Sequence, residues 1–364
     1  MFAKNGRNLV TLLRIERYMR SYDCGICVHI INDKYNVMMG KSLSIAWLIA
    51  LISVLSLSCS DANKANAKTD GTADVPAEGK AAGSIAQPYE VDDVYGDSTK
   101  ICQWLKDAEG VADKDLVLFF FKKMEGCPYV AHTLEHNKRE KLVVNVRDLD
   151  CTTSTENIMA LAICRKNNRL TFKDFCDVLM NIRYEKPYGG EDHEPRVAYS
   201  HRNHYFTGWA NSNIAQGYFE EITQPASIFS ATQRVSVNYM TANPQYYKML
   251  NETPTTLDSI RLMEMKLSDP KHNSYKFIPK SRLANTNTAE FRNAIHEGDI
   301  VVILTSKAGL DTQHITMAHW GDDNQLHIMH ASSIRKKVVF EPLTLYQYLM
   351  NQKSATGVRI LRLK

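Results

Sequence analysis

One cysteine of the chain stands where a nucleophile could be activated. Cys151 follows a strand-like run, LVVNV, and precedes a run typical of a buried helix, ENIMALAICR. Asp150, Thr152 and Thr153 are all good N-cap residues. Thr153 with Glu156 also fits a capping box. A helix N-terminus stabilises a thiolate through its unpaired N–H groups and its dipole. We therefore interpret Cys151 as a candidate nucleophile, with a buried structural cysteine as the alternative.

A cysteine nucleophile needs a base, which is nearly always a histidine. His314 and His330 lie in two neighbouring strand-like runs, QHITMAHW and QLHIMHAS, which are joined by GDDN. Because side chains alternate along a strand, pairing of the two runs through that turn would bring both histidines onto one face. Each histidine taken singly has a surface or structural role as its alternative. Together with Cys151, the pair predicts a cysteine nucleophile with a histidine base.

The runs around these residues predict an α+β fold. Residues 99–124 are expected to be helical, and Cys127-Pro128 would end that helix. TFKDFCDVLMNIRY has the apolar spacing of a further helix. Four short runs in the C-terminal third, DIVVILTS, QHITMAHW, QLHIMHAS and KKVVFEPL, are typical of strands. A run of strands after a run of helices indicates α+β architecture.

The N-terminal part has the pattern of a targeting signal rather than of a folded domain. In residues 41–60, KSLSIAWLIALISVLSLSCS, one lysine precedes a run of about sixteen mostly apolar residues. The run ends in small residues and a cysteine. We expect a lipoprotein signal peptide over residues 38–58 and a lipidated first residue at Cys59, with a plain transmembrane anchor as the alternative. Residues 1–37 would then come from a misplaced start codon, and Met38 or Met39 would be the expected start.

The segment after Cys59 has too few large apolar residues to fold. We therefore expect residues 59–97 to be a lipidated, disordered tether and residues 98–364 to be one folded domain. The expected localisation is that of a membrane-anchored lipoprotein facing the periplasm, in the outer membrane of a Gram-negative bacterium.

Composition excludes several classes of partner. The net charge of +4 comes without a basic run, which argues against a nucleic-acid surface, and no glycine-rich phosphate motif is present. The chain has 8 cysteines, and none follows Cys176, which is unlike a disulfide scaffold.

Four segments carry a family resemblance: PYVAHTLE, LDCTT, HYFTGW and GLDTQH. With EGDIVVIL and the strand ending in HAS, they resemble the NlpC/P60 cysteine peptidases. The closer similarity is to the branch of N-acetylmuramoyl-L-alanine amidase-like proteins first described as a domain of unknown function. This resemblance covers roughly residues 100–364. It implies a papain-like fold, in which a buried helix carries the cysteine and packs on an antiparallel sheet that carries the histidine pair.

The resemblance also implies roles for individual residues. Cys151 would be the nucleophile, His314 the base, and His330 the residue that orients the imidazole. Tyr129 matches a tyrosine whose hydroxyl lies beside the thiol. The sequence departs from the family pattern at three positions: His132 where glycine is expected, Ser154 where an aromatic residue is common, and Thr316 where glycine is usual.

The segment HRNHYFTGWANSN holds a candidate substrate-binding cluster. Arg202, Tyr205 and Trp209 supply a cation and flat apolar faces, which suit a carboxylate and a sugar. The alternative is that the aromatic residues belong to the core. The resemblance favours a cleft wall.

A zinc peptidase is a rival interpretation. His132, Glu135 and His136 form HxxEH, the spacing of inverted zinc peptidases. Two histidines four residues apart can share a metal on one helix face. The segment follows a proline, runs into a strand, and lacks a downstream carboxylate motif, so we expect no metal and no other cofactor.

The function implied by the resemblance is that of a cell-wall amidase. It would hydrolyse the amide between N-acetylmuramic acid and L-alanine in peptidoglycan fragments, with soluble anhydro-muropeptides as the expected partners. Two alternatives stay open. One is a D-glutamyl endopeptidase that cuts within the stem peptide, and the other is a non-catalytic cell-wall-binding module.

Overall fold

The structure is a computed structural model that describes residues 89–185, 196–251, 254–269, 271 and 273–364. The expected signal peptide, Cys59 and most of the expected tether lie outside the described residues. The end of the segment predicted as a tether is nevertheless folded. Strand β1 (Val91–Asp93) pairs with β2 (Leu142–Val144), and the buried Tyr89 donates a hydrogen bond to Asp177 at 2.6 Å. Residues 89–97, predicted as the end of the tether, therefore belong to the folded part.

Helices fill the N-terminal half, as the apolar spacing predicts. The single helix expected over residues 99–124 is two helices, because the chain turns at Gly110 with a positive φ of 80°. The helices of the described residues are α4 (Ser98–Asp107), α5 (Leu116–Met124), α6 (Cys151–Lys166), α7 (Phe172–Arg183), α8 (Phe206–Ala215), α9 (Tyr239–Ala242), α10 (Pro254–Leu267), α11 (Ala289–Ala294) and α12 (Leu345–Met350).

The C-terminal part forms one large sheet. The four strands expected there are present and pair antiparallel, and further strands join them. The remaining strands are β3 (Phe219–Ile222), β4 (Ala231–Arg234), β5 (Ser274–Pro279), β6 (Ile300–Thr305), β7 (Thr312–Trp320), β8 (Leu326–Ser332), β9 (Lys337–Phe340) and β10 (Ala355–Leu363). The strand order is β4-β5-β10-β6-β7-β8-β9, and β3 also pairs with β10.

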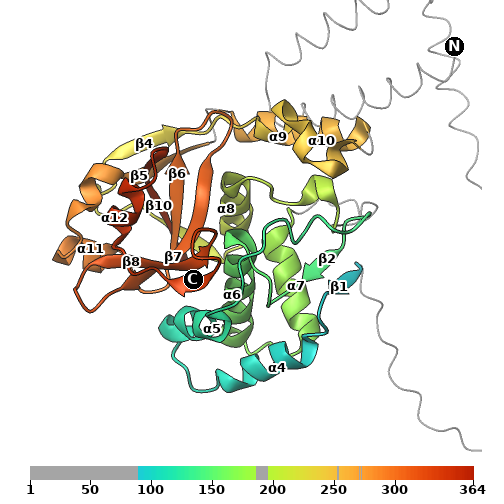
Figure 1. Cartoon of the computed structure of the whole chain (residues 1–364), viewed down its shortest axis with the longest axis horizontal. Coiled ribbons are helices and arrows are strands. Elements are labelled where there is room, and N and C mark those ends of the chain that lie inside the picture. Colours follow the sequence, from blue (N-terminus) through green and yellow to red (C-terminus); the bar gives the residue numbers. More distant parts are fainter. Residues whose placement is uncertain (1–88, 186–195, 252–253, 270, 272) are drawn as a thin grey trace, which may run out of the picture. The chain divides into compact units, whose positions relative to one another are not determined.

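Two apolar cores lie on opposite faces of this sheet. The larger core joins α4 to α8 with one face, which contributes Met317 and Met329 among others. The smaller core joins the other face, with Ala318 and Ile328, to α11 and α12. Figure 1 shows these layers, with the green helices on one side of the orange and red strands and α11 and α12 on the other. Strand β6 is buried at every residue because both of its faces are covered.

Helix α6 is the buried helix that the sequence predicts. Its residues from Thr153 to Cys164 are all buried, and the helix packs against α5, α7 and the strands β7 and β8. A helix that is covered on all sides places its first residue in a fixed position relative to the sheet. No helix within the described residues is long and apolar enough to cross a membrane.

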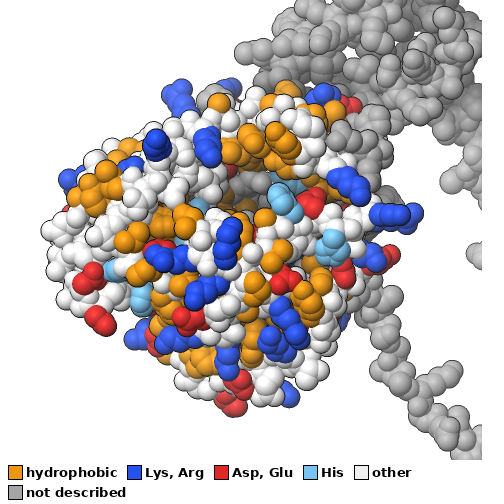
Figure 2. All heavy atoms as spheres, viewed as in Figure 1, with side chains coloured by type: hydrophobic (Ala, Val, Ile, Leu, Met, Phe, Trp, Pro, Cys, Tyr) orange, Lys and Arg blue, Asp and Glu red, His pale blue; other side chains and the backbone are white. Residues whose placement is uncertain are grey.

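Acidic and basic side chains are interspersed with apolar ones over the face drawn in Figure 2. That face carries no continuous basic stripe of the kind that a nucleic acid would need.

Candidate active site

Cys151 is the first residue of α6, where the sequence places it. Asp150 is the N-cap: its Oδ1 accepts a hydrogen bond from the Thr153 N–H at 2.8 Å, and the Asp150 N–H donates to Thr153 Oγ1 at 2.9 Å. The capping box is therefore Asp150 with Thr153, and the predicted box of Thr153 with Glu156 is wrong. Glu156 instead points into the core and pairs with Arg183 at 2.7 Å, with both side chains almost fully buried.

The thiol of Cys151 lies beside the strand that carries the histidine. Burial and the neighbouring Asp150 carboxylate raise its pKa to about 11. Hydrogen bonds from the backbone of Ile315 and from Thr152 act in the opposite direction. Ile315 follows His314 directly in β7, so the contact brings the N-terminus of α6 to the start of that strand. Figure 1 shows α6 lying along β7.

The two histidines meet as expected. Strands β7 and β8 pair antiparallel with Met317 opposite Met329, and the turn between them closes with a hydrogen bond from the Asn324 N–H to the Gly321 carbonyl. His314 Nε2 lies 2.6 Å from His330 Nδ1, a hydrogen-bond distance. This contact uses one nitrogen of His314 and leaves Nδ1 available for a second partner.

A carboxylate extends this chain of contacts, and the sequence interpretation missed it. His330 Nε2 lies 3.5 Å from Oε2 of Glu341, which follows strand β9. Arg335 holds that carboxylate with two hydrogen bonds, of 3.1 and 2.8 Å. Burial raises the pKa of Glu341, but the hydrogen bonds from Arg335 and the Leu343 N–H outweigh it, so the net pKa is lowered. The pattern held a usable signal, because in KKVVFEPL alternation places Glu341 on the same face as Val339, the partner of His330.

The ring of Tyr348, from α12, packs against both histidine rings. Its ring is nearly parallel to that of His314, with centroids 6.3 Å apart, and it meets the ring of His330 edge-on at 5.4 Å. No local pattern in the sequence marks this tyrosine, because only the packing of α12 on the sheet brings it there.

Both histidines are held neutral around pH 7. Burial, followed by the neighbouring ring, lowers the pKa of His314 to about 3. Burial also lowers the pKa of His330 to about 4, against the opposing charge of Glu341. Because the pKa of Cys151 is raised, Cys151 and His314 together hold one dissociable proton over a wide pH range. Such a pair can pass that proton from sulfur to nitrogen when the thiol attacks.

Tyr129 also lies in this group. It pairs with Leu149, two residues before Cys151, and its N–H donates to the Lys336 carbonyl at 2.9 Å. Burial, followed by the charge of Cys151, raises the pKa of its hydroxyl to about 12. The structure therefore brings together Cys151, His314, His330 and Tyr129, all of which the sequence singled out.

Two of the departures from the family pattern have local explanations. His132 adopts a φ of +63°, in the left-handed region that glycine favours, which accounts for an expected glycine at that position. Thr316 is buried in β7 and its hydroxyl donates to the Val301 carbonyl at 2.8 Å, so its extra atoms are accommodated. Ser154 is buried in the first turn of α6, and its hydroxyl donates to the Cys151 carbonyl.

The cluster predicted to bind substrate is buried in the structure. Tyr205 and Trp209 are only 4% and 3% exposed, and Trp209 stacks on Phe206 within the larger core. The buried Arg202 is held by Glu135 and Glu140 and lies over the ring of Tyr199. Both aromatic residues belong to the larger core, as the core alternative expects, and Trp209 packs against Phe206 of α8 and Phe219 of β3.

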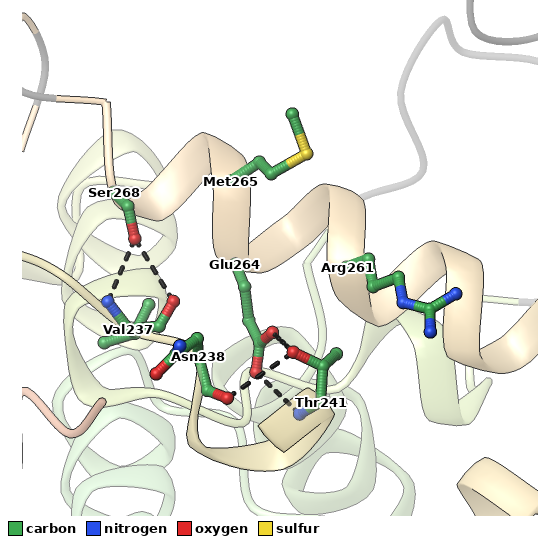
Figure 3. Close-up of a pocket in the computed structure, with 7 residues that line it drawn as sticks. All are labelled: Val237, Asn238, Thr241, Arg261, Glu264, Met265 and Ser268. Carbon is green, nitrogen blue, oxygen red and sulfur yellow. Dashed lines mark hydrogen bonds between the residues drawn. The ribbon is translucent and has the colours of Figure 1, made fainter. Parts of the chain in front are cut away.

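Tyr205 has a structural partner next to a surface pocket. Its hydroxyl donates to Glu264 Oε1 at 2.7 Å and accepts from the Met240 N–H at 3.0 Å. Glu264 also accepts from Thr241, and it lines a pocket of about 290 Å³ between α9 and α10. Figure 3 shows that the polar groups of this pocket bond mainly to one another, as Ser268 does with the Val237 backbone. We interpret the hydrogen bonds around this pocket as structural contacts that hold α9 against α10.

The zinc interpretation loses its geometric basis. Residues 131–135 form turns rather than a helix, so His132 and His136 do not share a helix face. His136 instead contacts Asp92 at 2.7 Å, and Glu135 pairs with Arg202. In the part of the chain that the structure describes, no group of three or more His, Cys, Asp or Glu side chains could hold a metal ion.

Comparison with known proteins shows which family the chain resembles. The profile of a family described as AmiA-like, N-acetylmuramoyl-L-alanine amidase-like, matches residues 120–358. The chain is 33% identical to an N-acetylmuramoyl-L-alanine amidase from Bacteroides uniformis, with a TM-score of 0.61 over 69% of this chain and 99% of that one. No curated protein matches the chain.

Two further solved structures are similar. A protein from Bacteroides fragilis described as a candidate xylanase is 33% identical, with a TM-score of 0.58 over 67% of this chain and 98% of that one. A Legionella pneumophila protein of the family DUF1460 is 19% identical, with a TM-score of 0.51 over 73% of this chain and 94% of that one. The last similarity is one of fold alone.

Proposed function

The chain belongs to the N-acetylmuramoyl-L-alanine amidase-like family, and from this premise we propose that it is a cell-wall amidase with a cysteine nucleophile. The observation that carries the proposal is the meeting of Cys151, at the N-terminus of a buried helix, with the strand bearing the hydrogen-bonded pair His314 and His330. We further propose that the fold is the papain-like fold of the NlpC/P60 peptidases. The buried helix packed on an antiparallel sheet supports this.

The proposed reaction is amide hydrolysis in two steps. As the Cys151 sulfur attacks the lactyl carbonyl of N-acetylmuramic acid, its proton passes to His314 Nδ1. The tetrahedral intermediate collapses to a thioester, and the same proton goes to the leaving amine of L-alanine. Water then attacks the thioester and gives a proton to His314, which returns it to sulfur as the acid leaves.

Other groups around the thiol have supporting roles in this proposal. The backbone N–H of Cys151 would donate to the developing oxyanion, which its position at the start of α6 supports. Tyr129 lies close enough for its hydroxyl to respond to charge at sulfur. His330 fixes the imidazole of His314 through the 2.6 Å contact. None of these steps calls on a metal or another cofactor.

The test uses a defined disaccharide-tetrapeptide and the corresponding free tetrapeptide, with products identified by mass spectrometry. We expect release of an intact peptide that begins with L-alanine. Cys151→Ala should abolish the reaction, whereas Cys127→Ala, at a half-buried thiol bonded to the Val146 carbonyl, should not. Cleavage of both substrates after D-glutamate would establish the endopeptidase alternative. Binding without cleavage by wild-type protein would establish the binding module.

We also propose the tether and location that the sequence predicts, for which the support is the sequence pattern alone. The mature protein would begin at lipidated Cys59 and face the periplasm. Replacing Cys59 with Ser should release soluble protein or leave unprocessed precursor. An unmodified mature peptide that spans Ser58, Cys59 and Ser60 would refute this proposal.

A further inference from the structure

The Glu341 carboxylate is buried, charged and directed at the histidine pair. Its side chain is 3% exposed, and its Oε2 lies 3.5 Å from His330 Nε2. A buried carboxylate costs free energy unless it is well partnered. Arg335 and the Leu343 N–H supply partners on one side, so the carboxylate stays ionised. On the other side the carboxylate faces His330 Nε2 at ion-pair distance, and this buried nitrogen makes no hydrogen bond with any described residue.

The order of hydrogen bonds along this chain determines where protons sit. If His330 Nε2 carries its proton toward Glu341, His330 Nδ1 has a free lone pair. His314 Nε2 must then carry the proton in the 2.6 Å contact, which leaves His314 Nδ1 unprotonated. An unprotonated Nδ1 is the form that can accept the Cys151 proton. With the opposite order, Nδ1 would already be protonated and could not act as a base.

The negative charge has a second effect. When the Cys151 proton moves to His314, a positive charge appears next to His330. Glu341 stabilises that charge through His330, whereas Arg335 opposes it. The other titratable groups around the pair are Tyr348 from α12, Cys151 from α6 and Tyr129.

We propose that Glu341 is a positioning residue that acts through His330 to set the tautomer of His314 and to favour proton transfer from Cys151. This inference rests on the proposed function, because it assigns His314 the role of base. It adds a fourth member, a carboxylate, to the Cys–His–His set. Arg335 bonds the other side of that carboxylate, and its positive charge opposes the imidazolium.

The experiment measures the rate at which iodoacetamide alkylates Cys151 between pH 5 and pH 10, by peptide mapping of the full folded chain. Cys102 and Cys127, which are partly exposed, serve as internal reference thiols. We expect Glu341→Gln to slow alkylation of Cys151 about tenfold at pH 7. We expect kcat on the muropeptide to fall about 10- to 100-fold at nearly constant KM, as is usual for residues that orient a reactive group through another.

Asp299→Asn is the matched control. Asp299 is equally buried and is also held by an arginine, with Arg362 bonding it at 2.9 and 2.7 Å, but its histidine neighbour is His296 and not His314 or His330. This variant should lose stability while keeping the wild-type alkylation profile. If Glu341→Gln slowed alkylation of Cys151 only by destabilising the fold, Asp299→Asn would change the alkylation profile in the same way. That result would overturn the proposal.

Arg335→Gln separates a charge effect from a structural one. Arg335 is 40% exposed, so the variant should fold, and it removes the positive charge that opposes the imidazolium. We expect alkylation at pH 7 to become about two- to threefold faster, opposite in sign to Glu341→Gln. If the ion pair were only structural, both variants would slow the reaction alike. Wild-type alkylation in folded Glu341→Gln would also overturn the proposal.

Two outcomes keep the result decisive. If Glu341→Gln fails to fold, Arg335→Gln decides alone: faster alkylation supports the proposal, and equal or slower alkylation overturns it. Alkylation requires no muropeptide, so failure of the amidase assay with the predicted alkylation profile would refute only the proposed substrate.

Discussion

Asp150 has two physical effects on Cys151 that substitution can separate. As the N-cap it holds the first turn of α6 through the 2.8 Å bond to the Thr153 N–H. As an anion it is the second cause, after burial, of the raised pKa of the thiol. Asp150→Asn keeps a capping oxygen and removes the charge. Asp150→Ala removes both.

The cap is measured by thermal unfolding. Replacing an N-cap aspartate by alanine costs about 0.5–2 kcal/mol, whereas asparagine caps about as well. For a domain of this size each kcal/mol changes Tm by about 2–4 °C. Asp150→Ala should therefore lower Tm by about 1–8 °C, and Asp150→Asn should leave it nearly unchanged.

The charge is measured by alkylation of the thiol at fixed pH. Removing a unit charge on the neighbouring residue should lower the pKa of Cys151 by roughly one unit. At pH 7, far below a pKa of about 11, this raises the thiolate fraction about tenfold. The less basic thiolate is about threefold less nucleophilic, since nucleophilicity falls with pKa at a slope of about 0.4–0.5. The net expectation for Asp150→Asn is about threefold faster alkylation.

The two readouts can fail independently. If Asp150→Asn left the alkylation rate unchanged while Asp150→Ala lowered Tm, the electrostatic part of the reasoning would be wrong. If both variants lowered Tm equally, the cap assignment would be wrong.

Three further results are expected from the folded part of the chain. Arg183→Met should lower the free energy of unfolding by about 3–5 kcal/mol, because it leaves the buried Glu156 carboxylate without its partner; a chemical-denaturation change under 1 kcal/mol would contradict this. Tyr205→Phe should cost about 1–3 kcal/mol of stability and leave KM unchanged, since its hydroxyl serves Glu264 rather than a substrate; a raised KM at unchanged stability would restore it to a cleft wall. Stability should fall on acidification from about pH 6.5 toward pH 3–4, because the unfolded chain binds protons that the folded His314 and His330, with pKa values of about 3 and about 4, do not; His330→Gln should flatten that slope in denaturation curves measured across pH.

Some features of the site depend only on local sequence. Cys151 stands between a strand-like run and a buried helix, so its position at a helix N-terminus is fixed by neighbours within a few residues. His314 and His330 share a face because strands have a period of two and the GDDN turn sets the register. The strands of the C-terminal third likewise follow from alternation and from their turn residues.

Local sequence was less informative where two interpretations fitted the same residues equally well. Thr153 with Glu156 fits a capping box as well as Asp150 with Thr153 does, and only the buried partner Arg183 decides for the latter. Tyr205 and Trp209 could equally line a cleft or fill a core. Their exposure depends on Glu264, Phe219 and other residues far away in the chain.

The sequence by itself determined the α+β class of fold and the positions of Cys151 and the two histidines within their elements, because periodicity and capping act between residues close in the chain. Only the tertiary structure decided what surrounds them. Glu341 lies against His330, and Tyr348 lies against both histidines, because separate elements pack on one sheet face. Such contacts depend on long-range packing, and no periodicity within a single segment encodes them.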